Sequence, residues 1–397
     1  MPGPLTDMRV LDLSRVLAGP YCTMMLADLG ADVIKVEAFE GDETRRFGPP
    51  FVGDESTYFL SVNRGKRSVA IDLKHNDGQR LALELARWAD VVVDNFRPGA
   101  ADKLGVGYAA LSSANPRLVY ASVSGYGLSG AEPYTTLPGY DLVIQGVGGI
   151  ASLTGPVGGA PYKMGTSVAD MVSGLNALAA ILAALHAREE SGKGVHLDIG
   201  MLDGQLSMLT YHASAWLNAG QRPARLGNAH PSICPYETFR AGDGWLNIAC
   251  GNDGQFAALC SALEQNAWVA DPRFATNARR VENREALLAL LAPLLAQQPL
   301  AHWLERIGEA GVPCGPILEV PEALAHAQAQ ARGMLVVQEH PTAGTVRTVG
   351  SPLGFGTPTF ATLPPPRLGE HTDQVLRDVL GHDSATIEDL RRRGAVQ

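Results

Sequence analysis

The stretch Met8-Arg9-Val10-Leu11-Asp12-Leu13 opens the pattern that decides the fold. Its apolar run predicts a buried strand, residues 20–29 follow as a helix with proline at the first position, and residues 33–36 form the next strand. A strand, a helix and a second strand in this order make one βαβ unit. Such a unit places its two strands parallel in one sheet.

The same alternation continues downstream. Residues 79–89 are predicted as a helix, and strands are predicted at residues 91–94, 118–124 and 195–199. We therefore expect the α/β class, with a doubly wound, mostly parallel sheet covered by helices on both faces. Ligands bind at the loops that follow such strands, which here are residues 14–19 and 95–99.

The middle of the chain has a different composition. After a helix predicted at residues 201–217 comes a loop rich in Pro, Asn and Arg, then a hairpin formed by residues 236–239 and 245–249. Helices are predicted at residues 283–295 and 300–310. The sequence thus predicts a large domain in residues 1–200, and a linker helix with a smaller inserted α/β domain in residues 201–329.

Composition narrows the possible partners. The 397 residues are 46% hydrophobic and carry 32 basic against 41 acidic side chains, a formal charge of −9. This balance provides no basic surface for nucleic acid or anionic lipid. Five widely spaced cysteines without a C-x-x-C motif favour a reducing compartment, and the apolar helix at residues 175–187 is too short to span a membrane. We expect a cytoplasmic protein with neither nucleic acid nor membrane as a partner.

Common catalytic motifs are missing from the sequence. Gly125-x-Gly127-x-x-Gly130 precedes a proline-containing segment that cannot propagate a phosphate-binding helix, and Gly65-Lys66 is not part of a P-loop. Neither G-x-S-x-G nor H-E-x-x-H occurs, and no histidine pair has metal-ligand spacing. We expect no bound metal and no tightly bound cofactor.

Asp170 is the candidate for chemistry. It lies among small or apolar residues in the stretch 165–174, and the apolar spacing that follows places it in or near the first turn of a helix. There the helix dipole and free N–H groups favour the ionised carboxylate. The alternative is that Asp170 only caps the helix.

Several further segments carry a resemblance to a known family. They are residues 9–20, 29–37, 63–68, 94–99, 124–127, 311–316 and 368–373. Their order and spacing resemble those of the class III coenzyme A transferases, the family of formyl-CoA transferase and carnitine CoA-transferase (CaiB/BaiF). The resemblance implies that Asp170 is the catalytic nucleophile, that residues 330–397 return to complete the large domain, and that two subunits interlock as a homodimer. His371 is expected to anchor the returning segment.

The resemblance also implies a binding site for coenzyme A, which enters as a substrate. A protein that makes acyl-CoA without ATP takes the thioester energy from another acyl-CoA. The expected CoA-binding residues are Val16, Leu17, Ala18, Ile71, Asp72, Lys74, Asn95, Phe96, Arg97 and Lys103, with Tyr140. A cationic cluster of Arg45, Arg46, Arg64, Lys66, Arg67 and Lys74 suits its phosphates.

Two departures from formyl-CoA transferase bear on the substrate. That enzyme has His and Gln at the positions of Arg15 and Leu17, so an oxalate or formyl specificity is not implied. Arg15 suits the second carboxylate of a dicarboxylic acid, and Arg46, Arg64, Gly251 and Asn252 are further candidates for substrate contacts. The predicted reaction moves CoA from succinyl-CoA to a C4–C6 dicarboxylate such as itaconate, citramalate, malate, mesaconate or glutarate.

Two other functions fit the same fold. An α-methylacyl-CoA racemase of this fold would carry histidine immediately before Asp141, where this chain has Tyr140, a poor acid–base group at neutral pH. A non-catalytic CoA-binding protein is the third possibility. The intact surroundings of Asp170 favour the transferase over both.

Overall fold

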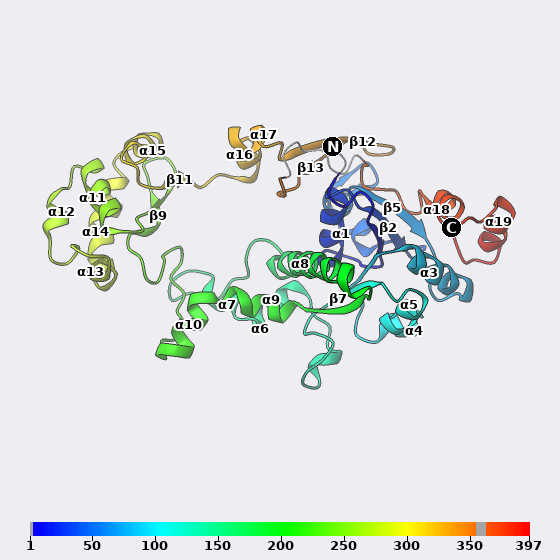
Figure 1. Ribbon diagram of the computed structural model, residues 1–397. Helices are drawn as coiled ribbons and strands as arrows, with labels where there is room; N and C mark the ends of the chain where they lie inside the picture. The colour runs from blue at the N-terminus through cyan, green and yellow to red at the C-terminus, as the bar shows by residue number, and fades with distance from the viewer. Residues whose placement is uncertain (1–2, 355–362) are drawn as a thin grey trace. The chain divides into compact units, whose positions relative to one another are not determined.

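The structure is a computed structural model that describes residues 3–354 and 363–397. It contains two compact units (Figure 1). The first comprises Met1–Ala151, Lys163–Gln221 and Ala327–Gln397, and the second comprises Ser152–Tyr162 and Arg222–His326. The ranges predicted from the sequence differ at three places, the smallest being that the first unit resumes at Ala327 and not at residue 330. Residues 201–221 lie with the first unit, where the helix Met201–Met208 packs on the helix Val168–Ser191, and Ser152–Tyr162 lies with the second.

A six-stranded sheet forms the centre of the first unit, and every neighbouring pair of strands is parallel. In spatial order the strands are β5 (Lys66–Ala70), β2 (Asp32–Glu37), β1 (Arg9–Asp12), β6 (Val91–Asp94), β7 (Val119–Ser124) and β8 (Val195–Gly200). The predicted α/β class with a parallel sheet is confirmed. Of these strands, β5 was not predicted, because its first residues are charged.

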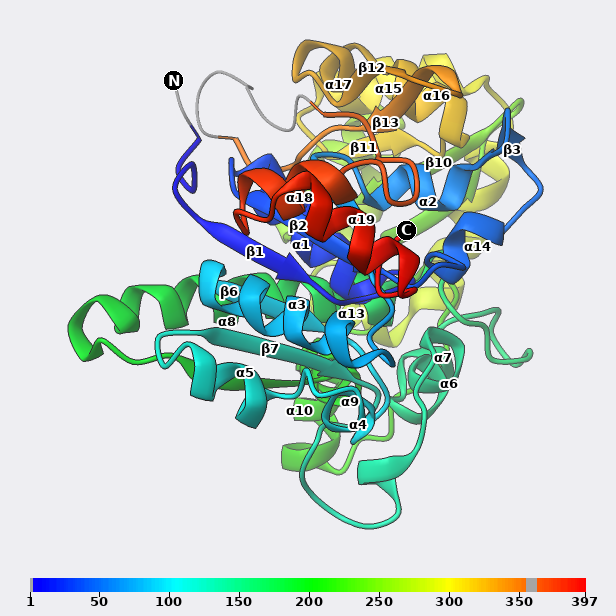
Figure 2. The ribbon, with the colours of Figure 1, turned by 90° about the vertical axis from the view of Figure 1, so that its right-hand side faces the viewer.

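Helices cover both faces of this sheet (Figure 2). Successive strand residues point to opposite faces, so Val10 packs against one helical layer and Leu11 against the other. One layer contains α1 (Ala18–Asp28) and α8 (Val168–Ser191). The other contains α3 (Asn76–Trp88), α5 (Tyr108–Ala114), α18 (Thr372–Asp378) and α19 (Ser384–Arg392). The last two helices bring the end of the chain onto the sheet.

Element boundaries differ from the predictions in specific ways. Helix α1 begins at Ala18, so Pro20 is its third residue and not its first. The single helix predicted at residues 201–217 is two helices, α9 (Met201–Met208) and α10 (Thr210–Ala219), and Thr210 has a positive φ of 36° at their junction. The segment after Met334 contains an unpredicted hairpin of β12 (Leu335–His340) and β13 (Gly344–Val349).

Helix α8 is longer than predicted. Its 24 residues are long and apolar enough to cross a membrane, which corrects the expectation that this segment is too short. Figure 1 shows α8 alongside α1, and Ala169, Ala177 and Ile181 are fully buried in the shared core. This packing is that of a core helix. The pair α14 (Arg284–Leu295) and α15 (Leu300–Glu309) passes the same test only when joined, and it is bent by 118°.

The second unit has its own small core. An antiparallel sheet in the order β11 (Cys314–Pro316), β10 (Trp245–Ala249), β9 (Tyr236–Arg240) packs against α11 (Asp253–Ala262), α14 and α15. Phe256, Leu259, Leu291 and Trp303 from these helices are buried with Leu246 and Ile248 of β10. The predicted hairpin and both predicted helices are present.

Candidate active site

The candidate site lies where the strand order of the large sheet reverses. Strands β1 and β6 are neighbours, and the chain continues from β1 to one side and from β6 to the other. Ligands of doubly wound folds bind at the carboxyl ends of strands at such a point. The loops after β1 and β6 are joined there, because the Arg15 N–H donates to Asn95 Oδ1 at 2.8 Å and Asn95 Nδ2 donates to the Arg15 carbonyl oxygen at 2.6 Å.

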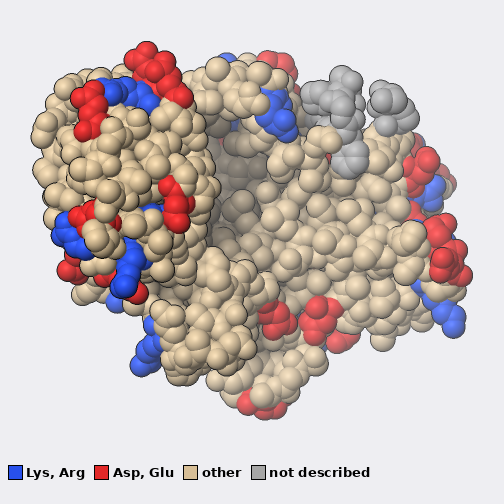
Figure 3. Space-filling view, turned by 60° about the vertical axis from the view of Figure 1, so that its left-hand side comes forward, with Lys and Arg blue, Asp and Glu red and all other residues tan. Residues whose placement is uncertain are grey.

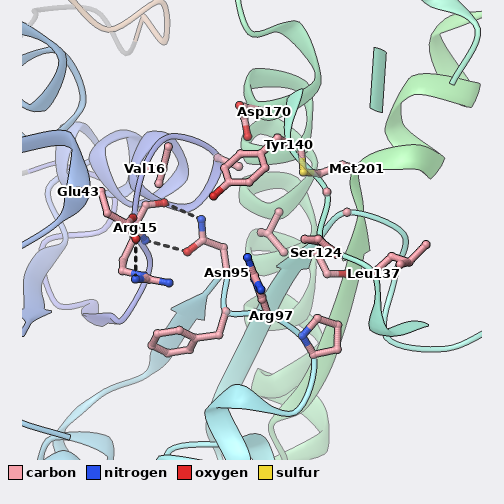
Figure 4. A pocket seen from close by; sticks show the side chains of 17 residues that line it. Arg15, Val16, Glu43, Asn95, Arg97, Ser124, Leu137, Tyr140, Asp170 and Met201 are labelled. Atoms are coloured by element: carbon pink, nitrogen blue, oxygen red, sulfur yellow. Dashed lines mark hydrogen bonds and ion pairs between the residues drawn. The ribbon is translucent and has the colours of Figure 1, made fainter. Parts of the chain in front are cut away.

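A pocket opens at this position, and Asp170 lines it (Figure 4). Figure 4 shows Asp170 reaching the pocket from α8, while Arg15, Asn95 and Arg97 come from the loops after β1 and β6. The other lining residues are Val16, Ala18, Glu43, Phe96, Pro98, Val123, Ser124, Gly125, Leu137, Pro138, Gly139, Tyr140 and Met201. All of them belong to the first unit.

The loop after β1 contains a strained residue. Val16 has a φ of 66°, a conformation that a β-branched side chain rarely adopts. Its N–H donates to both carboxylate oxygens of Asp42, each at 3.2 Å. Asp42 is itself buried and paired with Lys35 at 3.0 Å, so the loop is held by a charged group inside the protein. Burial opposes ionisation of Asp42, but Lys35 and Thr44 lower its pKa to about 2.

Asp170 is the third residue of α8, so its predicted place in a first helical turn is confirmed. The predicted effect of that position on its charge is wrong. Burial, and secondarily the charge of Asp141, raise the pKa of Asp170 from 3.8 to about 7. Burial, which disfavours the charged form of the carboxyl group, is the larger of these two causes. At neutral pH the ionised and the protonated forms of Asp170 are therefore both populated.

Asp141 is the neighbour that the sequence did not reveal. It begins α6 (Asp141–Val147) and is 8% exposed. Its Oδ1 accepts the Ala169 N–H at 2.9 Å, and its Oδ2 accepts Gln145 Nε2 at 2.8 Å. Asp141 thus satisfies a free N–H group at the start of α8, one residue before Asp170. Only the fold brings these two aspartates together, because 29 positions separate them in the chain.

Tyr58 is a second residue that the sequence did not single out. It lies in α2 (Thr57–Val62). Burial, and then the negative charges of Asp170 and Asp141, raise its pKa to about 12. The phenol is therefore protonated near the candidate nucleophile, and the apolar segment around it gave no signal of this.

The predicted CoA-binding residues divide into two groups. Val16, Ala18, Asn95, Phe96, Arg97 and Tyr140 line the pocket, and Leu17 stands between two of them as the N-cap of α1. Ile71, Asp72, Lys74 and Lys103 do not line it. Ile71 is fully buried in the core, which leaves its side chain no surface for a ligand, and it pairs with Val396 in an isolated bridge. For Asp72, Lys74 and Lys103 a contact with CoA stays a prediction.

The cationic cluster is largely an internal network, which corrects its interpretation as a phosphate site. Arg64 is 2% exposed and donates to the Asp28 carboxylate and to the Val349 carbonyl oxygen, so it is not available to a substrate. Lys66 is fully buried and forms an ion pair with Asp12. Arg45 and Arg67 pair with Glu37 and Asp32. Arg46 and Lys74 are exposed, but neither lines the pocket.

The remaining candidates lie elsewhere in the chain. Gly251 and Asn252 belong to the second unit, where Asn252 Oδ1 caps α11 by accepting the Gln255 N–H at 2.9 Å. Their contact with substrate stays a prediction. His371 bonds Ser68 twice, through its N–H and its Nδ1, as expected of an anchor for the returning segment. Within residues 3–354 and 363–397 no group of three or more potential ligands could hold a metal ion.

Charge on the surface agrees with the composition. Figure 3 shows Lys and Arg scattered over the face drawn, without one basic patch. The cationic residues that line the pocket are Arg15 and Arg97.

The chain matches known proteins along nearly its whole length. The family model of CoA-transferase family III matches residues 5–372. The chain is 40% identical over 396 residues to a mouse (Mus musculus) protein named succinyl-CoA:glutarate CoA-transferase, covering 99% of this chain and 90% of that one. It is 42% identical over 384 residues to an Agrobacterium fabrum protein named succinate–glutarate CoA-transferase, covering 95% and 96%.

A solved structure shares the architecture. The crystal structure of a CaiB/BaiF family protein from Brucella suis superposes with a TM-score of 0.86 at 41% identity, covering 96% of this chain and all of that one. The protein is an enzyme that uses CoA thioesters, and the chain belongs to CoA-transferase family III.

Proposed function

We propose that the enzyme moves CoA from succinyl-CoA to a C4–C6 dicarboxylic acid, with Asp170 as the nucleophile. The observation that carries the proposal is the position of Asp170 in the pocket at the β1–β6 reversal, with its pKa raised by burial and by Asp141 to about 7. A carboxylate with a raised pKa is more basic than a free one, and it is still ionised in a large fraction of molecules at neutral pH.

The reaction has two symmetrical halves. An Asp170 oxygen attacks the carbonyl carbon of the donor thioester, the C–S bond breaks, and a mixed anhydride and CoA thiolate form. The thiolate then attacks the aspartyl carbonyl carbon, which gives an aspartyl-CoA thioester and releases the donor acid. The acceptor carboxylate attacks this thioester, and the same steps run in reverse. Coenzyme A passes from the donor to the acceptor without net gain or loss, and no ATP is consumed.

The dicarboxylate class is supported by Arg15 and by the names of the relatives. Arg15 lines the same pocket as Asp170, and a guanidinium is suited to a carboxylate. Both relatives described above are named for glutarate, a C5 dicarboxylate. Among itaconate, citramalate, malate, mesaconate and glutarate, we therefore place glutarate first as the acceptor to be tested.

Racemisation is disfavoured by the surroundings of Asp141. Both of its carboxylate oxygens are occupied by hydrogen bonds inside the protein, and Tyr140 precedes it. A proton-exchanging pair needs a second acid–base group besides Asp170, and Tyr140 stands where a racemase of this fold would carry the histidine that supplies it. Asp141 instead supports the start of α8.

We also propose that the enzyme is a homodimer, as the resemblance implies. Large apolar side chains are exposed on α10 and α6 of the first unit, where a second copy would cover them: Tyr211, Trp216, Leu217, Leu142 and Val147. Sedimentation equilibrium of the full chain tests this. A monomer at micromolar concentration would contradict it.

The proposed mechanism can be tested by looking for a covalent modification of Asp170. Incubation with succinyl-CoA alone should leave a thioester on Asp170, which hydroxylamine converts to a hydroxamate and borohydride reduces to an alcohol, both seen by peptide mass spectrometry. Asp170→Asn should give neither product and no transfer to glutarate. A racemase would instead exchange solvent deuterium into the α-position of a branched acyl-CoA without any acceptor. Rapid deuteration with an unmodified Asp170 would overturn the transferase mechanism.

A further inference from the structure

Arg15 is not free in the pocket. Its Nη1 atom contacts Glu43 Oε1 at 3.0 Å, and the two side chains are 45% and 42% exposed. Glu43 begins the short helix η1 (Glu43–Arg46), which Asp42 caps, and both Arg15 and Glu43 line the pocket (Figure 4). The guanidinium carbon of Arg15 also lies 5.6 Å from the centroid of the Phe96 ring. The Glu43 carboxylate thus pairs with Arg15, which is the cation that we assign to the second carboxylate of the substrate.

This ion pair differs from those that hold the fold together. Arg45 donates two hydrogen bonds to the Glu37 carboxylate, both at 2.7 Å. Arg67 donates two to the Asp32 carboxylate, at 3.0 and 2.6 Å. Arg15 uses a single donor toward Glu43. A bidentate pair is strong and fixed, whereas an exposed single contact is weak and readily exchanged. The Arg15–Glu43 pair is therefore the one suited to being replaced.

We propose that Glu43 sets the selectivity for the acceptor by occupying Arg15 until the second carboxylate of a dicarboxylate substrate replaces it. The inference rests on the proposed function, in which Arg15 receives that carboxylate. Arg15 is then paired with Glu43 in the free enzyme and with the substrate carboxylate in the complex. The binding free energy that a dicarboxylate gains from Arg15 is therefore only the difference between these two ion pairs. An acid without a second carboxylate leaves the Arg15–Glu43 pair in place. Glu43 therefore reduces the preference for dicarboxylates that Arg15 alone would produce.

The expected size follows from the exposure of the pair. Exposed ion pairs contribute a factor of roughly 1.5–5 to an equilibrium. Removing the charge of Glu43 should therefore increase the ratio of kcat/KM for glutarate to kcat/KM for pentanoate by about 1.5- to fivefold. Pentanoate has the same chain length and lacks the second carboxylate. The increase should come from a lower KM for glutarate and not from a higher kcat.

The experiment uses Glu43→Gln in the full-length enzyme, with succinyl-CoA saturating. Both acids are measured as acceptors, or pentanoate as a competitive inhibitor of glutarate if its turnover is too slow. Glu40→Gln is the matched control, since it removes the same charge from an exposed residue three positions away that does not line the pocket. Arg15→Leu and the double variant Arg15→Leu/Glu43→Gln complete the cycle. In the absence of Arg15, the Glu43 substitution should no longer change the ratio.

Three results would overturn the inference while leaving CoA transfer intact. One is a higher KM for glutarate in Glu43→Gln, which would mean that Glu43 holds Arg15 in its binding position. Another is an equal change for both acids or in Glu40→Gln, which would indicate a general effect of charge. The third is an unchanged effect of Glu43→Gln in the Arg15→Leu background. A wild-type enzyme that fails to transfer CoA from succinyl-CoA would instead overturn the proposed function, and the inference with it.

Discussion

Asp141 and Asp170 bring two carboxyl groups to the start of one helix, where Asp141 accepts the N–H of Ala169 and its charge adds to the effect of burial in raising the pKa of Asp170 to about 7. The same residue therefore builds the helix terminus and tunes the nucleophile. This arrangement allows the ionisation of Asp170 to be tested separately from its position.

Activity should follow the ionisation of Asp170. The protonated form predominates below about pH 7, and only the carboxylate attacks the thioester. The value of kcat/KM for the acyl-CoA donor should therefore fall about tenfold for each pH unit below about 6.5, and it should level off above about pH 7.5. Initial rates between pH 5 and 9 measure this. A profile that is flat down to pH 5 would show that the carboxyl group titrates normally.

Asp141→Asn should move the acidic limb of that profile to lower pH. The amide oxygen can still accept the Ala169 N–H, so the start of α8 is retained, while the neighbouring charge is removed. The hydrogen bond from Gln145 to Oδ2 is lost, which costs about 1 kcal/mol of stability. Because burial is the larger cause, only part of the increase in the pKa of Asp170 should disappear. An unmoved limb would show that Asp141 acts only on structure.

Asp170→Asn should stabilise the protein at high pH. A carboxyl group whose pKa is higher in the folded than in the unfolded chain makes the fold less stable as pH rises from about 4 to about 7. The difference between 3.8 and about 7 limits the effect to about 4 kcal/mol, and solvent screening of the partly exposed group reduces it. Calorimetric Tm values of the Asn variant should exceed those of the wild type at pH 8, with a smaller excess at pH 5. The exposed Asp54→Asn serves as the control. An excess that is independent of pH would point to packing instead.

Arg64→Met should damage stability and leave substrate affinity unchanged. It leaves the Asp28 carboxylate buried without its partner, a loss of about 3–5 kcal/mol. Urea unfolding measures this loss, and Arg64→Met/Asp28→Asn should recover much of it. In the purified variant, the KM for succinyl-CoA should match that of the wild type. A higher KM with unchanged stability would restore Arg64 as a substrate residue.

The sequence predicted the elements that have strong local signals. The apolar run of residues 8–13, the helix after it and the spacing beyond Asp170 were enough to predict a parallel sheet and an aspartate in a first helical turn. The role of nucleophile came from the resemblance and stays a prediction. Residues Val16, Asn95 and Tyr140 were assigned to the site through resemblance, and they line its pocket. Family likeness thus predicted part of the pocket lining.

Long-range electrostatics could not be predicted in this way. Arg64 and Lys66 look like exposed cations in the sequence, because the carboxylates that neutralise them, Asp28 and Asp12, are 36 and 54 positions away. The raised pKa of Asp170 depends on burial and on Asp141, neither of which a first-turn aspartate reveals. The charge state of a side chain depends on the residues that the fold brings around it, whereas its position in a helix depends mainly on the sequence next to it.

The apolar face of the large sheet is covered partly by the last helices of the chain, which has a consequence for its synthesis. Leu11 and Leu81 share their core with Val375, Leu390 and Val396. At about 5–20 residues per second, a ribosome needs roughly 15–60 s to proceed from the former group to the latter. During that time α3 and α5 are already made, and the part of this sheet face that α18 and α19 cover in the complete fold stays exposed. This core can therefore close only after α18 and α19 have been translated.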